Sequence, residues 1–223
     1  MSVVNKKYAI VLFSGGLDST TTLMIAKSLN FNIIALTINY KQRHISELDA
    51  SKHILNDHPD IKHIIFDVNL SKIGGSALTD STIDVPDMSS DEIPVTYVPA
   101  RNTIFLSIAA AYAERFDIAD IFIGVNAIDY SGYPDCRPDY IKKFQELADL
   151  ANKRGRENNP IKLWTPLLDL NKEEIIKLAF DNHVPLDKTW SCYSGNSKPC
   201  GKCDSCRIRN AAYEKWLNNN NKK

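Results

Sequence analysis

The chain has 223 residues, and its 27 Lys and Arg balance 27 Asp and Glu, so the formal net charge is zero. This balance excludes an overall attraction to nucleic acid or to an anionic membrane, and we expect no stable partner of either kind. No apolar run approaches the ~20 residues that span a bilayer, and the N-terminal residues carry no apolar signal core. We therefore expect a cytoplasmic protein. We also expect one main domain, since α/β units of about 200–250 residues are common.

The first third of the chain alternates predicted strands and helices. Apolar runs predict strands over Lys7–Phe13, Asn32–Tyr40 and Lys62–Val68. Helical spacing predicts a helix that begins near Leu17 and another over His44–Asn56. This alternation is typical of a parallel sheet covered by helices. We therefore predict an α/β fold with an open parallel sheet and helices on both faces.

The first strand and helix are joined by a glycine-rich loop, Ser14-Gly15-Gly16-Leu17-Asp18-Ser19. Its two glycines let the backbone turn tightly and point N–H groups in one direction, and the helix adds the positive end of its dipole. Such a loop binds phosphate, and Asp18 could hold a metal ion. The loop lacks both the lysine of a Walker A motif and the G-x-G-x-x-G spacing of a Rossmann fold. The alternative is an ordinary glycine turn.

The segment Ser71–Glu92 interrupts the alternation with two adjacent glycines and many Ser, Thr and Asp residues. We expect it to be too polar for a core element, and to form a surface excursion or lid. A loop with no role in the site fits the same composition.

The second half returns to predicted helices and one short strand. Asn102 can cap a helix, and Pro138 suits the first turn of another. A buried strand is predicted between them over Ile121–Gly124. Asn171 and Glu174 form a capping box that begins a third helix.

Four of the five cysteines lie close together, at Cys192, Cys200, Cys203 and Cys206. Cytosolic thiols are kept reduced, so this crowding indicates a metal site and not disulfides. Four thiolates can close around a structural zinc ion; an iron–sulfur cluster is the alternative, although nothing else suggests electron transfer. We therefore expect a main domain over 1–186, a small helical zinc-binding appendage over 187–218 and a frayed tail over 219–223. The last helix is predicted over 208–217.

Two polar segments, Val98–Asn102 and Gly124–Pro138, begin where predicted strands end. Ligands of open α/β sheets bind beyond the carboxyl ends of the strands, so we expect both segments to line one crevice with the glycine-rich loop. Singly, Arg101 could instead pair with a surface acid, and Tyr133 with Pro134 could form a rigid turn.

The side chains of these segments suit a charged, ring-shaped ligand. Acids could hold Mg²⁺ or accept N–H groups of a heterocycle, tyrosines could stack on a base, and arginines could bind a carboxylate or a phosphate. The residues concerned are Asp129, Asp135, Tyr130, Tyr133, Arg101 and Arg137.

The glycine-rich loop resembles the SGGxDS loop of the N-type ATP pyrophosphatases, the PP-loop family. The resemblance implies that the loop holds the β,γ-pyrophosphate of ATP and leaves the α-phosphate open to attack. It therefore implies transfer of AMP and not kinase chemistry. The nucleotide-binding residues expected on this ground are Phe13, Ser14, Gly15, Gly16, Leu17, Asp18, Ser19 and Thr20.

Taken together, the loop, Val98–Asn102, the Asp129–Pro138 run and the four cysteines resemble the 7-cyano-7-deazaguanine synthase family. The resemblance spans nearly the whole chain and implies a fold like that of the adenine nucleotide alpha hydrolases. It also implies an ATP-dependent carbon–nitrogen ligase of queuosine biosynthesis. Such an enzyme converts 7-carboxy-7-deazaguanine and ammonia to 7-cyano-7-deazaguanine through adenylated intermediates.

The resemblance suggests roles for the candidate residues and a homodimer. We expect catalytic roles for Asp18, Arg101 and Asp129, with Asp18 and then Asp129 as the ligands of Mg²⁺. We expect substrate contacts from Tyr130, Tyr133, Asp135 and Arg137. The expected cofactors are ATP, Mg²⁺ and structural Zn²⁺, the zinc being held by the four clustered cysteines.

Free ammonia is the expected nitrogen donor. Glutamine-dependent transfer needs a nucleophilic cysteine, either at the N-terminus or beside a histidine in a glutaminase domain. Residue 2 is Ser, and Cys136 is the one cysteine that is not assigned to metal. We expect Cys136 to be a small buried group lining the pocket. Two alternative functions stay open: a PP-loop tRNA sulfurtransferase, against which the neutral charge counts, and a non-enzymatic ATP-binding protein.

Overall fold

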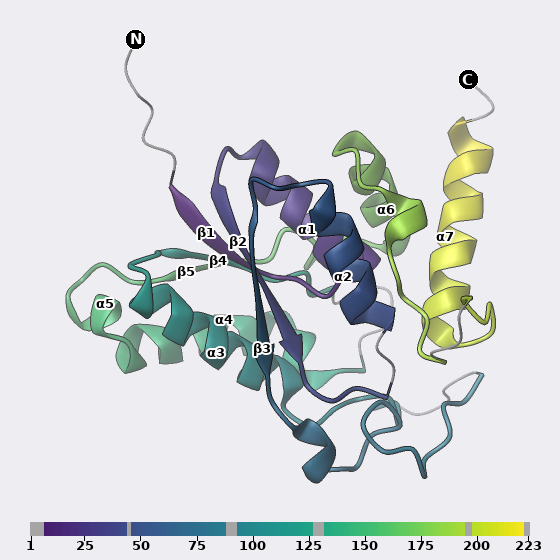
Figure 1. Ribbon diagram of the computed structural model, residues 1–223, viewed down its shortest axis with the longest axis horizontal. Helices are drawn as coiled ribbons and strands as arrows, with labels where there is room; N and C mark the ends of the chain where they lie inside the picture. Colours follow the sequence, from purple (N-terminus) through teal and green to yellow (C-terminus); the bar gives the residue numbers. More distant parts are fainter. Residues whose placement is uncertain (1–6, 44–45, 88–92, 127–131, 195–197, 221–223) are drawn as a thin grey trace.

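The computed structural model describes residues 7–43, 46–87, 93–126, 132–194 and 198–220 (Figure 1). Within these residues a five-stranded parallel sheet has the order β3-β2-β1-β4-β5. The strands are β1 (Tyr8–Leu12), β2 (Asn32–Asn39), β3 (Lys62–Asp67), β4 (Asp120–Phe122) and β5 (Lys162–Trp164).

Helices cover both faces of this sheet, as predicted for an open α/β fold (Figure 1). The α-helices are α1 (Leu17–Ser28), α2 (Ser46–Asn56), α3 (Arg101–Arg115), α4 (Pro138–Ala151), α5 (Lys153–Arg156), α6 (Lys172–Asp181) and α7 (Asp204–Asn220). Short 3₁₀ turns are η1 (Leu70–Lys72), η2 (Pro134–Cys136) and η3 (Leu186–Lys188). One core contains α3 and α4, and the other contains α1, α2, α6 and part of α7.

The central strand β1 shows why the fold forms from this sequence. Ala9, Ile10 and Val11 are 0% exposed, and successive side chains enter opposite cores. Side chains of a strand alternate between the two faces, so a strand covered on both sides reads as a continuous apolar run. Because β1 pairs in parallel with both β2 and β4, the carboxyl ends of these three strands meet at one edge of the sheet.

The edge strand β5 was not predicted from the sequence. It has only three residues, too few for a periodic signal, and Lys162 is exposed. Its Trp164 ring stacks on Phe122 of β4 with ring centroids 5.2 Å apart. The strand is therefore set by contacts that are distant in the sequence.

The predicted capping role of Asn102 is wrong. Helix α3 begins at Arg101, and Asn102 lies inside its first turn. Its backbone N–H donates to Asp135 Oδ2 at 2.9 Å, while its side-chain Nδ2 donates to the backbone oxygen of Asp135 at 3.1 Å. A carboxylate from a distant segment thus satisfies an N–H group that a local cap would otherwise satisfy.

The prediction that Ser71–Glu92 is wholly a surface excursion is also wrong. Residues 76–79 are buried, and Leu78 belongs to the core that contains α3 and α4. Ala77 N–H donates to the Val95 oxygen at 2.9 Å, and Arg43 N–H donates to the Leu78 oxygen at 2.8 Å. The polar composition is compatible with burial because neighbouring segments supply hydrogen bonds. Residues 88–92 lie outside the described residues.

The last helix is longer than predicted and continues through Asn220, into the segment expected to be frayed. It packs along α6, where the Trp216 and Phe180 rings stack with centroids 3.8 Å apart. Asn219 Nδ2 donates to Glu173 Oε1 at 2.8 Å, which holds the final turn. The capping box of Asn171 and Glu174 at the start of α6 is confirmed. Among the described residues, none of the helices has the length and apolar character needed to cross a membrane.

Candidate active site

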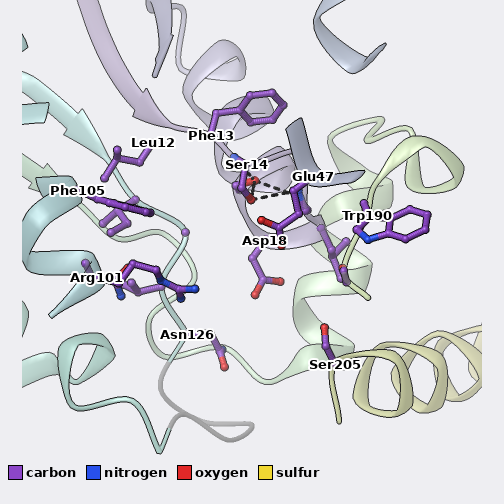
Figure 2. A pocket seen from close by; sticks show the side chains of 18 of the residues that line it. Leu12, Phe13, Ser14, Asp18, Glu47, Arg101, Phe105, Asn126, Trp190 and Ser205 are labelled. Atoms are coloured by element: carbon purple, nitrogen blue, oxygen red, sulfur yellow. Dashed lines mark hydrogen bonds between the residues drawn. The ribbon is translucent and has the colours of Figure 1, made fainter. Parts of the chain in front are cut away.

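A cavity of about 300 Å³ opens at the carboxyl edge of the sheet. Five helices contribute residues from their N-terminal ends: α1, α2, α3, α6 and α7. Helix N-termini carry partial positive charge and free N–H groups, so this arrangement favours anionic ligands. Figure 2 shows Ser14 and Asp18 on the loop side, Arg101 and Phe105 on another side, and Ser205 at the start of α7.

The glycine-rich loop is tightly packed and holds its own polar groups together. Gly15 has φ +83°, and a Cβ there would lie 2.5 Å from the Ser51 nitrogen of α2. The Oγ atoms of Ser14 and Ser19 are 3.1 Å apart, and Ser14 N–H donates to Ser19 Oγ at 3.2 Å. Only glycine fits at position 15, because both the positive φ and the nearby backbone exclude a side chain.

Six of the eight predicted nucleotide-binding residues line the cavity: Phe13, Ser14, Gly16, Leu17, Asp18 and Ser19. The other two shape the loop. Gly15 allows its turn, and Thr20 Oγ1 donates to the Gly16 oxygen at 2.7 Å. The structure therefore brings the predicted phosphate-binding groups to one wall of the cavity.

Asp18 pairs with Lys172, a residue that the sequence analysis missed. Lys172 Nζ lies 2.9 Å from Asp18 Oδ2 and 3.0 Å from Oδ1, and both side chains face the cavity. Lys172 follows the capping residue Asn171 directly, at the first position of α6. The capping box predicts the start of the helix, so a lysine directly after it was a usable signal for a cation at a helix N-terminus. The strand β5, which precedes this helix, was not predicted, so the position of the lysine at the edge of the sheet could not be inferred. The loop lacks a lysine of its own, and α6 supplies one.

Arg101 occupies another part of the cavity, among aromatic rings. Its guanidinium carbon lies 6.0 Å from the Tyr40 ring centroid and 5.8 Å from that of Tyr133. Tyr133 also pairs its hydroxyl with Thr96 Oγ1 at 2.9 Å. Burial raises the pKa of Tyr40, and the nearby Glu47 raises it further. Tyr40 therefore stays protonated and can donate a hydrogen bond.

The other predicted substrate residues are separated by the structure. Asp135 is buried beside the N-terminus of α3. Burial raises the pKa of its carboxyl group above the usual value, and the hydrogen bond from the Asn102 N–H only partly offsets this rise. Arg137 is exposed at the N-cap of α4 and does not line the cavity. Cys136 lines the cavity and is buried, as expected. Asp129 and Tyr130 lie outside the described residues, so their predicted roles stay predictions.

Glu47 is a second cavity residue that the sequence analysis missed. It lies in the first turn of α2 and lines both the large cavity and a smaller cavity beside it. Burial raises the pKa of its carboxyl group, and Arg101 partly offsets that effect. The usable signal was its position, early in the helix that follows β2.

The four clustered cysteines could hold a metal ion, as predicted. Their sulfur atoms all lie within 4.8 Å of one another, and they are the one such group of metal-binding side chains among the described residues. Tetrahedral zinc with bonds of about 2.3 Å needs sulfur separations of about 3.8 Å, so the set fits zinc. Burial raises the pKa of Cys200, but N–H groups of Cys203 and Lys202 outweigh it and lower the pKa to about 6.

The cysteine cluster is tied directly to the cavity wall. Trp190 N–H donates to the Gly15 oxygen at 2.9 Å, and Trp190 Nε1 donates to the Cys192 oxygen at 3.0 Å. Helix α7 begins at Asp204, between two of the clustered cysteines, and contributes Arg209 to the cavity lining. The cysteine cluster therefore adjoins Trp190, which is hydrogen-bonded to the glycine-rich loop, and the start of α7.

Comparisons with known proteins agree with this geometry. A 7-cyano-7-deazaguanine synthase from Prochlorococcus marinus (strain AS9601) is 68% identical over 226 aligned positions, covering 100% of both chains. One from Thermosynechococcus vestitus is 54% identical and covers 95% of this chain and 93% of the relative. NMN synthetase from Francisella tularensis shares the fold at 16% identity, with a TM-score of 0.51 over 94% of this chain and 78% of that chain.

The family comparison covers almost the whole described chain. The model of the family described as "Queuosine biosynthesis protein QueC" matches residues 8–217. This range includes the glycine-rich loop, Arg101, Lys172 and all four clustered cysteines. The chain therefore belongs to the family of the queuosine biosynthesis protein QueC.

Proposed function

We propose that this protein is an ATP-dependent carbon–nitrogen ligase that makes 7-cyano-7-deazaguanine from 7-carboxy-7-deazaguanine and ammonia, for queuosine biosynthesis. The observation that carries the proposal is a single cavity that joins a phosphate-binding loop to a buried arginine among aromatic rings. The first part suits the phosphates of ATP, and the second suits an aromatic carboxylate. The names of the relatives support the same reaction.

The loop end of the cavity would bind the β- and γ-phosphates. Ser14, Gly16 and Ser19 line this space at the positive end of α1, and the hydroxyls of the two serines lie 3.1 Å apart. Lys172 would move from Asp18 to a phosphate oxygen, which frees the Asp18 carboxylate. That carboxylate fits Mg²⁺, which proteins commonly hold with one or two carboxylates and the substrate phosphates. Bound there, Mg²⁺ would neutralise negative charge that develops on the phosphates.

The aromatic end would bind the deazaguanine carboxylate. Arg101 can form two parallel hydrogen bonds to a carboxylate, and Tyr40 can donate a third. Tyr133 and Phe105 offer ring surfaces beside it. These contacts would hold one carboxylate oxygen toward the α-phosphate of ATP, which the loop leaves uncovered.

The reaction then uses two adenylations. A carboxylate oxygen attacks the α-phosphate, the α–β phosphoanhydride bond breaks, and pyrophosphate leaves on the loop side. Ammonia attacks the acyl carbon, displaces AMP and loses a proton to solvent, which forms the amide. The amide oxygen attacks the α-phosphate of a second ATP and releases pyrophosphate. Loss of AMP, which carries away the amide oxygen, and of both amide protons to solvent leaves the nitrile.

Product analysis tests this proposal. The protein would be incubated with ATP, ammonium and 7-carboxy-7-deazaguanine, without RNA, and the products identified by mass spectrometry. We expect the nitrile, AMP and pyrophosphate. Formation of ADP would contradict the proposed use of the loop. A requirement for RNA would favour a sulfurtransferase, and ATP binding without AMP formation would favour a non-enzymatic protein.

We also propose that the four cysteines hold structural zinc, and that the enzyme is a cytoplasmic homodimer. The close sulfur atoms and the N–H groups directed at them support zinc. Elemental analysis should find about one zinc per chain, because one four-cysteine set holds one ion. Iron with acid-labile sulfide would instead identify a cluster. Sedimentation analysis measures the oligomeric state, and cell fractionation measures the location.

A further inference from the structure

The base of 7-cyano-7-deazaguanine has hydrogen-bond donors that Arg101, itself a donor, cannot pair with. Its six-membered ring has two adjacent N–H donors, at ring N1 and at the 2-amino group, on the side away from the carbon substituent. If a cavity buries these donors without acceptors, binding is weakened by their lost hydration. A carboxylate accepts both at once, because its two oxygens match two parallel N–H groups. This inference rests on the proposed function.

Glu47 is a cavity carboxylate whose hydrogen-bonding capacity is unused. Its side chain makes no hydrogen bond and no ion pair with any other described residue. Burial raises the pKa of its carboxyl group, which means that the surroundings destabilise the charged form. Two N–H donors from a ligand would replace the hydrogen bonds that its surroundings do not supply.

The other acids that line the described cavity are already engaged. Asp18 pairs with Lys172 at 2.9 Å, next to the phosphate loop. Asp204 lies 3.9 Å from Arg207 Nη1, at the start of α7. Of the three acidic residues in the described lining, Glu47 is therefore the one left for a neutral donor pair.

Glu47 and Arg101 are placed to bind two ends of one molecule. Glu47 belongs to α2 and Arg101 to α3, helices that cover opposite faces of the sheet. No ion pair joins them, but the Arg101 charge lowers the pKa of Glu47, and both charges act on the pKa of Tyr40, so the two side chains face the same part of the cavity. Tyr40 and Tyr193 line the same cavity, so a flat ring would meet aromatic surface between the two charges.

We propose that the Glu47 carboxylate accepts the N1–H and a 2-amino hydrogen of the deazaguanine base, while Arg101 binds the carboxylate at its other end. Glu47 is then the residue that selects a guanine-like base. A base without the 2-amino group leaves one carboxylate oxygen unpaired, and a base with acceptors at this edge is repelled.

The test pairs one substitution with one substrate change. The Glu47→Gln variant and the wild type are compared with 7-carboxy-7-deazaguanine and with its analogue lacking the 2-amino group, by AMP formation. We expect the wild type to prefer the parent base about 100-fold in kcat/KM. In Glu47→Gln, the amide NH₂ opposes one donor, so kcat/KM for the parent base falls about 100-fold, mainly through KM. The variant hardly distinguishes the two bases, and its KM for ATP changes less than about twofold.

Asp49→Asn is the matched control, because Asp49 is an exposed acid on the same helix, two residues away. It removes the same charge and should leave kcat and KM for each of the two bases unchanged. Circular dichroism and ATP binding establish that Glu47→Gln is folded. Calorimetry with 7-cyano-7-deazaguanine and with its analogue lacking the 2-amino group measures the same selectivity without turnover.

Two results would overturn the inference. One is a wild-type protein that uses both bases equally well, a result that is measured without any variant. The other is a folded Glu47→Gln protein that loses activity toward both bases by the same factor. In either case AMP formation by the wild type upholds the proposed function. If the wild type forms no AMP from the parent base, the proposed function itself fails, and this inference fails with it.

Discussion

The end of the cavity proposed to bind the phosphates (the phosphate end) and the end proposed to bind the base (the base end) differ in how their polar groups are satisfied. At the phosphate end, Ser14 and Ser19 bind each other, and Asp18 pairs with Lys172. At the base end, Glu47 has no hydrogen bond among the described residues, and Arg101 lies over aromatic rings. The first end is preorganised by its own contacts, whereas the second depends on the ligand to pair its charges. Substitutions at the two ends should therefore fail differently.

Asp18→Asn should have the largest effect on the phosphate end. It removes the charge proposed to hold Mg²⁺, so we expect pyrophosphate release to fall about 1,000-fold while the protein stays folded. Coupled pyrophosphate detection and a thermal melt measure the two quantities. Asp139→Asn is the control, since Asp139 lies in the first turn of α4, away from the cavity. Full activity of Asp18→Asn would contradict the assigned role.

Gly15→Ala should damage the same end through its backbone. The new Cβ would meet the Ser51 nitrogen at 2.5 Å with φ at +83°, so we expect a loss of about 3 kcal/mol in unfolding free energy. Gly74→Ala separates the two causes, because Gly74 has φ +71° but no atom within 4 Å of its Cβ position. It should lose only about 1 kcal/mol. Urea denaturation gives both values, and equal losses would disprove the steric cause.

Arg101→Lys should affect only the base end. Lysine keeps the charge but loses the planar fork, so KM for the carboxylate substrate should rise about 50-fold. KM for ATP should change less than about twofold, because the phosphate loop is unchanged. Steady-state kinetics with each substrate varied measures both. Arg115→Lys, at the far end of α3, should behave as the wild type. An equal rise in both constants would show that the two ends are not separate.

Asn171→Ala should have the smallest effect. Asn171 Oδ1 accepts the Glu174 N–H at 3.0 Å, and its loss should lower stability by about 1 kcal/mol. The change also loosens Lys172, so KM for ATP should rise by about threefold. Asn182→Ala alters the opposite end of α6, where Asn182 Nδ2 donates to the Leu178 oxygen. It should leave KM for ATP unchanged. A thermal melt and ATP kinetics on both variants make this comparison.

The two ends also differ in how well sequence reasoning found them. The glycine-rich loop is contiguous, and its glycines carry a local backbone requirement, so a tight turn between β1 and α1 was predictable from the sequence. The base end is assembled from α2, α3 and the segment before η2. Glu47 has no local motif, and its role depends on which strands lie side by side. Asp135 and Arg137 are two residues apart, yet the η2 turn buries one and exposes the other.

The fold was predictable where apolar runs were long, as in β1 and β2, and was missed where it depended on distant contacts. The three residues of β5 are a strand because Trp164 stacks on Phe122. Asn102 lost its predicted capping role because Asp135, 33 positions away, accepts the backbone N–H. Residues 76–79 are buried because Val95 and Arg43 satisfy their backbone groups.

The hydrogen bond from Trp190 N–H to the Gly15 oxygen joins the cysteine cluster to the phosphate loop at one point. Coupling between two binding sites is reciprocal, so each ligand alters the affinity of the other by the same factor. A nucleotide that holds the loop in place should therefore raise the affinity of the four cysteines for their metal. Removal of that metal should in turn weaken nucleotide binding by the same factor.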